Sequence, residues 1–285
     1  MSAAQFVSAL PYRAFRIARI ALLILQDTLD ALAAIVFAAP CRICGQTMAS
    51  ASLIPICADC LAEVQPIAGP KCASCGRPFI SPIAAQYPNL HCQLCRRGVY
   101  GFIRARSFGV YNDTLGGAIV LLKYDAVTRI GSWFASKLEP IVREELAGLK
   151  FDAIVPVPLH PARQRERGYN QAELIAKPFA KRLGIKLGSY LLVRTRPRPE
   201  KFLLTRKERW RSVRGAYETR SGAKVDKLRI LLVDDVFTTG ATLDACSRAL
   251  LRAGAASVTG LTVARVVPEV ARSEPNGHPD ASNTT

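Results

Sequence analysis

The sequence lacks an uninterrupted apolar stretch long enough to cross a membrane. Residues 20–39 come nearest, but Asp27 and Asp30 interrupt them, whereas a spanning helix needs about 20 consecutive, mostly apolar residues. Pro40 directly before Cys41 also argues against a lipoprotein signal, because small residues are expected at that place. The sequence therefore predicts no transmembrane span.

An amphipathic helix is predicted within residues 1–39 instead. Its apolar positions alternate at spacings of three and four and form one stripe: Leu22, Leu25, Leu29, Leu32 and Val36. Pro40 ends the helix. Packing of the stripe against the rest of the protein is favoured. Binding to a membrane surface, through the same stripe and the arginines before it, stays open.

Acidic residues are scarce, with 22 Asp and Glu against 39 Lys and Arg. The net charge of +17 and the pI near 9.9 favour polyanionic partners, namely nucleic acid, phosphorylated ligands or an anionic membrane surface. Residues 194–229 alone carry 13 Lys and Arg against 4 Asp and Glu. With 285 residues, 49% of them hydrophobic, the chain can form about two domains with a buried core.

Cysteine is almost absent outside four Cys-x-x-Cys pairs, because Cys246 alone among nine cysteines lies elsewhere. The pairs are Cys41 with Cys44, Cys57 with Cys60, Cys72 with Cys75, and Cys92 with Cys95. Two thiolates at this spacing can bind one tetrahedral ion from a tight turn. Disulfides would require an oxidising compartment, which nothing in the sequence supports, and iron is a weaker alternative that stays open. We therefore expect two structural zinc ions.

An internal repeat suggests how the pairs combine. Glycine follows the second cysteine of the first and third pairs, as Gly45 and Gly76, but not of the other two pairs. A turn of this kind needs a residue that tolerates positive φ just past its second sulfur, which glycine does. The first and third pairs are thus equivalent halves of two repeats. Sequential sites are favoured over a cross-braced arrangement, in which the pairs would alternate between the two ions.

After Cys95 the composition changes, and apolar strands alternate with helical patterns. Strands are expected at residues 106–111, 153–158, 228–234 and 258–264, and helices at residues 115–124, 133–146, 171–183 and 243–253. This alternation predicts an α/β fold with a mainly parallel sheet flanked by helices. Residues 268–285, rich in Pro, Ser, Asn and Gly, are predicted to be a disordered tail.

The segment Ile-Leu-Leu-Val-Asp-Asp-Val-Phe-Thr-Thr-Gly-Ala-Thr at residues 230–242 carries the most specific chemistry. A buried strand delivers Asp234 and Asp235 to the carboxyl edge of the sheet, where open α/β folds bind ligands. The turn that follows offers hydroxyls and backbone N–H groups at a helix start, which suits an anion. Carboxylates beside such a turn suit a sugar phosphate. Helix capping by Asp235 or Thr238 alone is the simpler alternative, and it leaves the combined motif unexplained.

This motif resembles the phosphoribosyl pyrophosphate (PRPP) signature of the type I phosphoribosyltransferases. The resemblance implies that Asp234 and Asp235 hold the ribose hydroxyls and act as the catalytic carboxylates. It also implies that the 5′-phosphate binds to the turn, whose residues are Thr238, Thr239, Gly240, Ala241 and Thr242. Mg²⁺ would bridge the pyrophosphate and ribose oxygens.

The wider chain is similar to the competence protein F (ComF) family, which joins a double zinc ribbon to a phosphoribosyltransferase-like domain. The motifs that carry this resemblance lie at residues 121–124, 155–160, 167–171, 206–209 and 213–217. Lys201 and Ser212 depart from the Gln and Asn that members often carry there, which puts the acceptor in doubt rather than PRPP binding. The residue patterns and the resemblance together predict domains at 1–39 (N-terminal amphipathic helix), 40–98 (double zinc ribbon), 99–267 (phosphoribosyltransferase-like) and 268–285 (disordered tail).

Basic residues around the second strand are candidates for holding pyrophosphate. Arg163, Arg165 and Arg167 follow the strand exit, and a guanidinium donates two hydrogen bonds to phosphate oxygens. A solvated basic turn is an equally good interpretation of any one of them. Lys123 could reach the pyrophosphate, or merely complement a helix end. His160, between prolines, is expected to be structural.

Taken together, these features predict a PRPP-binding, phosphoribosyltransferase-like protein that transfers phosphoribosyl with Mg²⁺ to an unknown acceptor, has an accessory role in DNA uptake, or does both. The alternative is a non-catalytic scaffold of the competence machinery that binds DNA or protein. Single-stranded DNA and competence proteins are thus possible partners, with Phe202, Trp210 and Tyr217 as stacking candidates. A cytoplasmic location is expected. Cys246 is expected in the core, not at the chemistry.

Overall fold

The computed structural model describes residues 40–48, 52–197 and 205–267. The chain divides into two compact units, Met1–Glu63 and Val64–Thr285. The second four-cysteine segment therefore belongs to the same compact unit as the sheet. Across the described ranges, no helix is long and apolar enough to cross a membrane.

Three predictions fall on other parts of the chain. The N-terminal helix at residues 1–39, the tail at residues 268–285, and Lys201 and Phe202 all lie outside the described residues.

The two cysteine turns repeat the same backbone pattern, one in each unit. In the first turn, Cys41 N donates to the carbonyl of Gln46 at 2.7 Å, and Gly45 N donates to the carbonyl of Cys41 at 2.9 Å. In the second turn, Cys72 N donates to the carbonyl of Arg77 at 2.8 Å, and Gly76 N donates to the carbonyl of Cys72 at 2.9 Å. Both glycines have positive φ, at 78° and 70°. The sequence repeat is thus a structural repeat, with glycine where the backbone requires it.

The eight sulfurs of the pairs gather in two groups, each within 4.8 Å. The first cluster is Cys41, Cys44, Cys57 and Cys60, and the second cluster is Cys72, Cys75, Cys92 and Cys95. Sulfur–sulfur separations are 3.9 Å for Cys41 and Cys60 and 3.7 Å for Cys44 and Cys57. Four ligands about 2.3 Å from a tetrahedral zinc lie about 3.8 Å apart, whereas a disulfide is about 2.0 Å long. Both clusters therefore fit structural zinc, in the sequential rather than the cross-braced arrangement.

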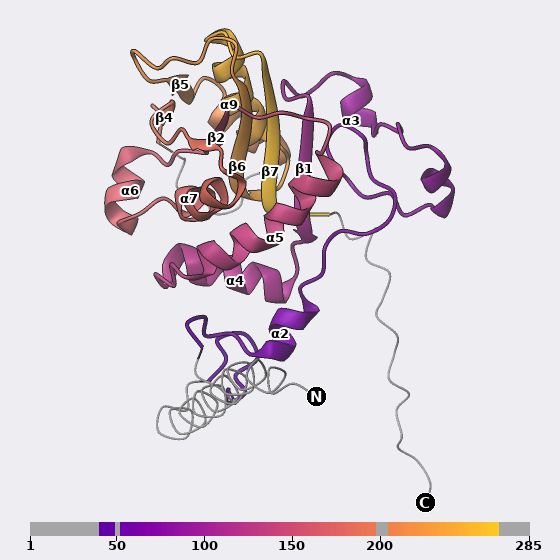
Figure 1. Ribbon diagram of the computed structural model, residues 1–285, viewed down its shortest axis with the longest axis vertical. Helices are drawn as coiled ribbons and strands as arrows, with labels where there is room; N and C mark the ends of the chain where they lie inside the picture. The colour runs from indigo at the N-terminus through magenta and orange to yellow at the C-terminus, as the bar shows by residue number, and fades with distance from the viewer. Residues whose placement is uncertain (1–39, 49–51, 198–204, 268–285) are drawn as a thin grey trace, which may run out of the picture. The chain divides into compact units, whose positions relative to one another are not determined.

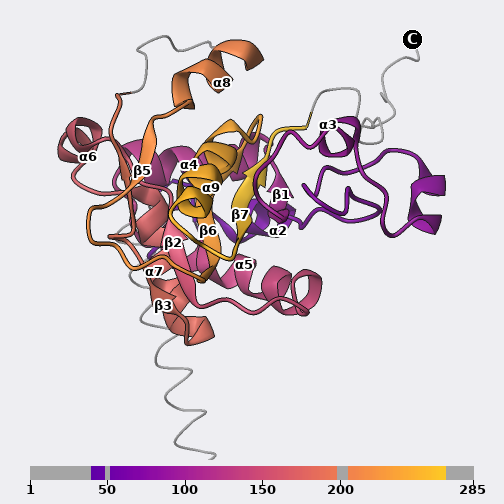
Figure 2. The same ribbon diagram turned by 90° about the horizontal axis from the view of Figure 1, so that it is seen from above.

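A five-stranded parallel sheet forms the centre of the second unit, with strand order β1-β7-β6-β2-β3. The strands are β1 (Arg104–Val110), β2 (Ala153–Pro156), β3 (Lys186–Leu187), β6 (Arg229–Phe237) and β7 (Ser257–Arg265). The main helices are α4 (Asp113–Tyr124), α5 (Ile130–Glu145), α7 (Gln171–Leu183) and α9 (Ala241–Arg252). Figures 1 and 2 show α5 and α7 along one face of the sheet and α9 along the other. The predicted α/β class is confirmed.

Smaller elements complete both units. Helix α2 (Ala58–Glu63) lies in the first unit. In the second unit, η2 (Pro82–Gln86) lies between the two cysteine pairs of the second cluster, and α3 (Gln93–Arg96) contains Cys95. Helix α6 (Pro161–Arg167), helix α8 (Arg206–Val213) and the antiparallel pair β4 (Leu192–Arg194) and β5 (Tyr217–Thr219) were not predicted. The start of α8 does carry a signal in the sequence, a capping box between Thr205 and Glu208.

Strand β6 runs three residues further than predicted. Its pairing with β7 continues from Asp234 opposite Thr262 to Phe237 opposite Arg265. Both aspartates thus lie inside the strand, held by ladder hydrogen bonds on a central strand, rather than in the loop after it.

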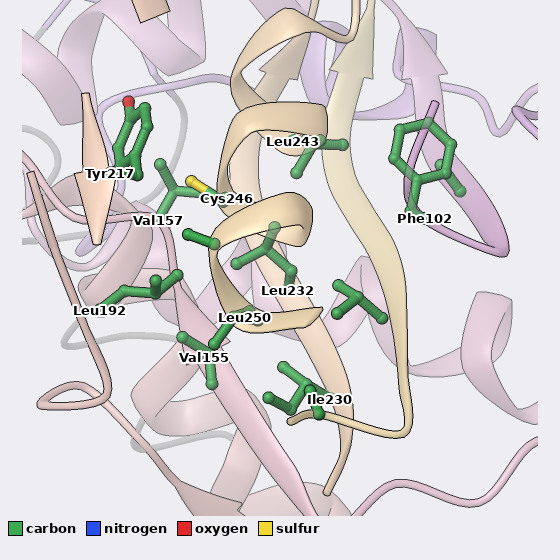
Figure 3. Close-up of a cluster of buried hydrophobic side chains, with 14 of the residues drawn as sticks. Phe102, Val155, Val157, Leu192, Tyr217, Ile230, Leu232, Leu243, Cys246 and Leu250 are labelled. Carbon is green, nitrogen blue, oxygen red and sulfur yellow. The ribbon is translucent and has the colours of Figure 1, made fainter. Parts of the chain in front are cut away.

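The core between the sheet and α9 is built from alternate strand positions. Figure 3 shows Ile230 and Leu232 of β6 facing Leu243 and Leu250 of α9, with Val155 of β2 beside them. All five side chains are buried, and each contributes roughly 1.5–3 kcal/mol by leaving water. Cys246 is fully buried in the same cluster, as expected. This packing fixes the start of α9 over the end of β6.

Metal analysis should find two zinc ions per chain in protein expressed with ample zinc. Cys75→Ser should remove one ion and lower the thermal stability of the second unit, because structural zinc stabilises small domains by on the order of 10 kcal/mol. Cys41→Ser should remove the other ion without that loss, since the first cluster lies in the first unit. A wild-type content below two ions would contradict the assignment.

Candidate active site

A cleft of about 640 Å³ opens at the carboxyl edge of the sheet. Its walls come from the end of β6, the end of α4, helix α6, strands β4 and β5, and helix α8. Among the predicted site residues, those that line it are Lys123, Arg163, Arg167, Asp234, Asp235, Thr238, Thr239, Ala241 and Thr242. Residues that lie far apart in the sequence thus meet at the edge where parallel sheets bind ligands.

The two aspartates at the end of β6 are almost completely buried, with 8% of Asp234 and 5% of Asp235 exposed. The Oδ1 atom of Asp235 accepts a hydrogen bond from Nε2 of Gln171 at 3.1 Å. The Oδ2 atom of the same carboxylate forms an ion pair with the Lys123 ammonium. Asp234 accepts from the backbone N–H of Asp235 at 2.9 Å. The side chains are therefore fixed before any ligand arrives.

The pKa values of the two carboxyls are driven apart. Burial and the adjacent charge of Asp235 raise the pKa of Asp234 well above its usual range. Burial also opposes ionisation of Asp235, but the Lys123 ammonium and the Gln171 hydrogen bond outweigh it and lower the pKa of that carboxyl. In return, the negative charge of Asp235 overcomes burial and raises the pKa of Lys123. The pair thus titrates in separate steps, with Asp235 the ionised partner.

Residues 238–242, here named the 238–242 loop, lead from β6 into α9. Gly240 occupies the N-cap position with φ of 80°, so the N-cap residue itself has no side chain to cap the helix. The capping interpretation of Asp235 or Thr238 is therefore wrong. The Oγ1 atom of Thr239 accepts from the N–H of Ala241 at 3.3 Å, and the remaining N–H groups of the first turn are available to an anion.

The residues that follow helix α6 connect several elements around the cleft. Gly168 ends α6 in the left-handed conformation, at φ of 82°. The hydroxyl of Tyr169 donates to the carbonyl of Leu122 at 2.7 Å, and Asn170 caps α7 and donates to the carbonyl of Val157 at 3.0 Å. This segment therefore ties the end of α4 and the exit of β2 to the start of α7.

The residues predicted to bind pyrophosphate do not all lie in the cleft. Arg163 and Arg167 line the cleft, whereas Arg165 does not. Arg167 donates to Oε1 of Gln171 at 2.6 Å and lies over the ring of Tyr124 at 5.1 Å. His160 caps α6 by accepting from the N–H of Ala162 at 3.3 Å, which agrees with a structural role.

Several cleft residues were missed. Arg194 of β4 is buried, donates from Nη1 to the hydroxyl of Tyr217 at 3.1 Å, and lines the cleft with it. Strands β4 and β5 have only three residues each, which is too short for a recognisable sequence pattern. Their pairing, which brings Arg194 and Tyr217 together, therefore could not be predicted. Tyr217, predicted as a stacking candidate for nucleic acid, is 2% exposed and lines the cleft. Ser212, a departure from the family pattern in the sequence, lines the cleft as well.

Gly240→Ala should lower the stability of the second unit by more than Gly184→Ala. A Cβ at Gly240 would lie 2.6 Å from Cζ of Phe237 and 2.6 Å from Cε1 of Tyr100, whereas at Gly184 it would meet nothing within 4 Å. Both have positive φ, so the control carries the conformational strain of about 1 kcal/mol without the clash. Equal losses in denaturant unfolding would contradict the tight packing of the loop.

Comparison with known proteins extends these observations. A model of the double zinc ribbon domain matches residues 32–96. The DNA utilization protein YhgH of Salmonella typhimurium is 32% identical over 206 residues, covering 71% of this chain and 87% of that protein. Competence protein F of Haemophilus influenzae is 29% identical, covering 74% and 90%, and competence protein ComFC of Bacillus subtilis is 28% identical, covering 74% and 84%.

The similarity to solved structures is weaker. The glutamine PRPP amidotransferase of B. subtilis, complexed with ADP and GMP, is 21% identical over 47% of this chain and 26% of its own, with a TM-score of 0.33. Adenine phosphoribosyltransferase from Saccharomyces cerevisiae is 17% identical over 51% and 72%, with a TM-score of 0.32. The strand order and register of the parallel sheet define the fold of the second unit. Similarity to YhgH over most of both chains, together with the double zinc ribbon, shows that this protein belongs to the competence protein F family.

Proposed function

We propose that the cleft binds PRPP with Mg²⁺ and that the protein transfers phosphoribosyl to an acceptor as part of DNA uptake. The observation that supports this most directly is the convergence of paired carboxylates, a helix start with glycine at its N-cap and two arginines on one cleft of about 640 Å³. No single one of these features would suffice, because each has a structural interpretation on its own. Their combination at a sheet edge suits a sugar that carries phosphate at both ends.

The ribose would lie against the end of β6. Its 2′- and 3′-hydroxyls would donate hydrogen bonds to Asp234 and Asp235, whose burial keeps water from competing. The 5′-phosphate would accept hydrogen bonds from the 238–242 loop. Thr238 and Thr242 supply hydroxyls there, and the helix dipole of α9 favours the negative charge.

The pyrophosphate would occupy the other end of the cleft, towards Arg163 and Arg167. As it leaves C1 of the ribose, positive charge develops on the sugar and negative charge on the leaving oxygens. The arginines would stabilise the leaving group, and ionised Asp235 would stabilise the sugar cation. Mg²⁺ would enter with the pyrophosphate as part of the substrate and neutralise its charge.

Lys123 occupies one of the two carboxylates proposed to bind ribose. Its ammonium contacts the carboxylate of Asp235, where ribose hydroxyls would bind. Binding of PRPP would displace the ammonium from Asp235, and pyrophosphate oxygens offer it new partners. The side chain would thus pass from one end of the substrate to the other, which agrees with its predicted role.

The biological role comes from the relatives. They are named as competence proteins and as DNA utilization proteins. We infer the same context for this chain, with single-stranded DNA and competence proteins as partners and the cytoplasm as location. The net charge of +17 supports a polyanionic partner.

Calorimetric titration of the zinc-loaded protein with Mg·PRPP tests the binding proposal. Wild type should bind with a Kd in roughly the micromolar range. Asp234→Asn combined with Asp235→Asn should abolish binding and leave the fold intact. The matched control is Asp113→Asn with Asp226→Asn, which makes the same two substitutions at exposed positions outside the cleft and should bind normally. Unchanged affinity in the cleft variant would remove the ribose assignment.

Pyrophosphate release during an acceptor screen separates an enzyme from a scaffold. The scaffold alternative has its own support, since the ion pair with Lys123 occupies an oxygen of Asp235 that the proposal assigns to ribose. A protein that binds no Mg·PRPP but binds single-stranded DNA, with affinity falling steeply as salt rises, would favour that alternative.

A further inference from the structure

The second cysteine turn is joined to the sheet through three consecutive carbonyls. The carbonyl of Ala73 accepts from the guanidinium of Arg106 at 3.2 Å, and that of Ser74 accepts from the N–H of Ala105 at 2.6 Å. The carbonyl of Cys75 accepts from the guanidinium of Arg265 at the end of β7. The turn is thus bonded to the start of β1 and to the end of β7.

The glycines of the two cysteine turns differ in how closely they approach the rest of the protein. A Cβ at Gly76 would lie 2.8 Å from the carbonyl oxygen of Ala105, whereas at Gly45 of the first turn it would meet nothing within 4 Å. Glycine in the second turn therefore serves a close approach to the sheet as well as a positive φ. The two repeats share a backbone pattern but not an environment.

From the last cysteine of the second cluster, the chain runs directly to the start of α9. The N–H of Gly101 donates to Oδ1 of Asp244 at 2.7 Å, and Nη2 of Arg248 donates to the carbonyl of Val99 at 3.0 Å. Asp244 is buried and also pairs with Arg248. Residues 99–101 are therefore bonded to the first two turns of α9.

Tyr100, at the centre of this segment, contacts the 238–242 loop itself. Its hydroxyl donates to the carbonyl of Thr239 at 3.0 Å, and its ring lies where a Cβ of Gly240 would be. The ring stacks on Phe102 with centroids 4.7 Å apart and meets Phe237 edge-on at 6.1 Å. Burial raises the pKa of Tyr100, so the hydroxyl keeps the proton that it donates.

A second route reaches the same place. The guanidinium of Arg265, which bonds to Cys75, lies over the ring of Phe237 at 3.8 Å from its centroid. Phe237 in turn lies against the Cα of Gly240, since its Cζ is 2.6 Å from the position of a Cβ there. The cluster therefore supports the loop from two directions, through Tyr100 and through Arg265 and Phe237.

We propose that the second cluster positions the 238–242 loop through Tyr100, so that phosphate binding in the cleft depends on metal occupancy of this cluster. The identity of the ligand rests on the proposed function. The coupling between the second cluster and the loop does not depend on it. Sulfurs of Cys75 and Cys92 lie 3.7 Å apart, as a shared tetrahedral ion requires. Without that ion the arm from Cys92 to Tyr100 loses its anchor, and the loop loses the hydrogen bond to Thr239.

Hydrogen exchange of the full chain tests the coupling without any ligand. Tyr100→Phe should raise amide exchange across residues 238–244 several-fold, whereas Tyr190→Phe, at a side chain that is 61% exposed and outside the cleft, should not. Cys75→Ser should raise exchange in the same segment, and Cys41→Ser, in the first unit, should leave it unchanged. Unchanged exchange in Tyr100→Phe, or equal effects of the two cysteine variants, would overturn the proposal.

Two probe ligands then give the functional consequence. Tyr100→Phe should weaken binding of ribose 5-phosphate about fivefold and leave binding of Mg·pyrophosphate within about twofold, because only the former uses the loop. Equal weakening of both ligands would indicate general destabilisation and overturn the positioning role. If wild type binds neither ligand while the exchange result holds, the proposed function fails and the coupling stands.

Discussion

Burial of two adjacent carboxylates at the end of β6 is the constraint around which the cleft is arranged. Like charges in a weakly polar interior repel strongly, so one carboxyl resists ionisation and the other needs counter-charge and hydrogen-bond donors. Lys123 supplies the charge from the end of α4, and Gln171 supplies a donor from the start of α7. Tyr169 then links the segment before α7 to the end of α4. Elements that lie far apart in the sequence are thus brought together by the electrostatic requirements of one strand end.

Much of the α/β architecture could be predicted because its local signals are strong. Helix α7 begins and ends at the predicted residues, since Asn170 caps its start and Gly184 ends it in the left-handed conformation. The 238–242 loop was recognisable because its residues are contiguous. Strand β6 was predicted too short, because the sequence of β6 does not reveal how far its pairing with β7 continues.

Other parts of the site depend on long-range contacts and carried no local signal. Arg194 and Tyr217 meet only because two very short strands pair across a long connection. The Lys123–Asp235 ion pair joins residues more than a hundred positions apart, so neither could be assigned a partner from spacing. Tyr100 gave no motif at all, and its role depends on the position of α9. Periodicity identifies elements well, whereas contacts between elements require the fold.

The glycine at the N-cap of α9 has a thermodynamic consequence. An N-cap side chain typically stabilises a protein by about 1 kcal/mol, and Gly240 supplies none, so a ligand bound at the 238–242 loop would add stability at this helix start. Folding and occupancy are then linked, because a ligand that binds only the native state adds RT ln(1 + [L]/Kd) to the free energy of unfolding. At a hundred times its Kd this amounts to about 2.7 kcal/mol. The equilibrium stability of the folded chain would therefore rise with the concentration of the proposed sugar phosphate.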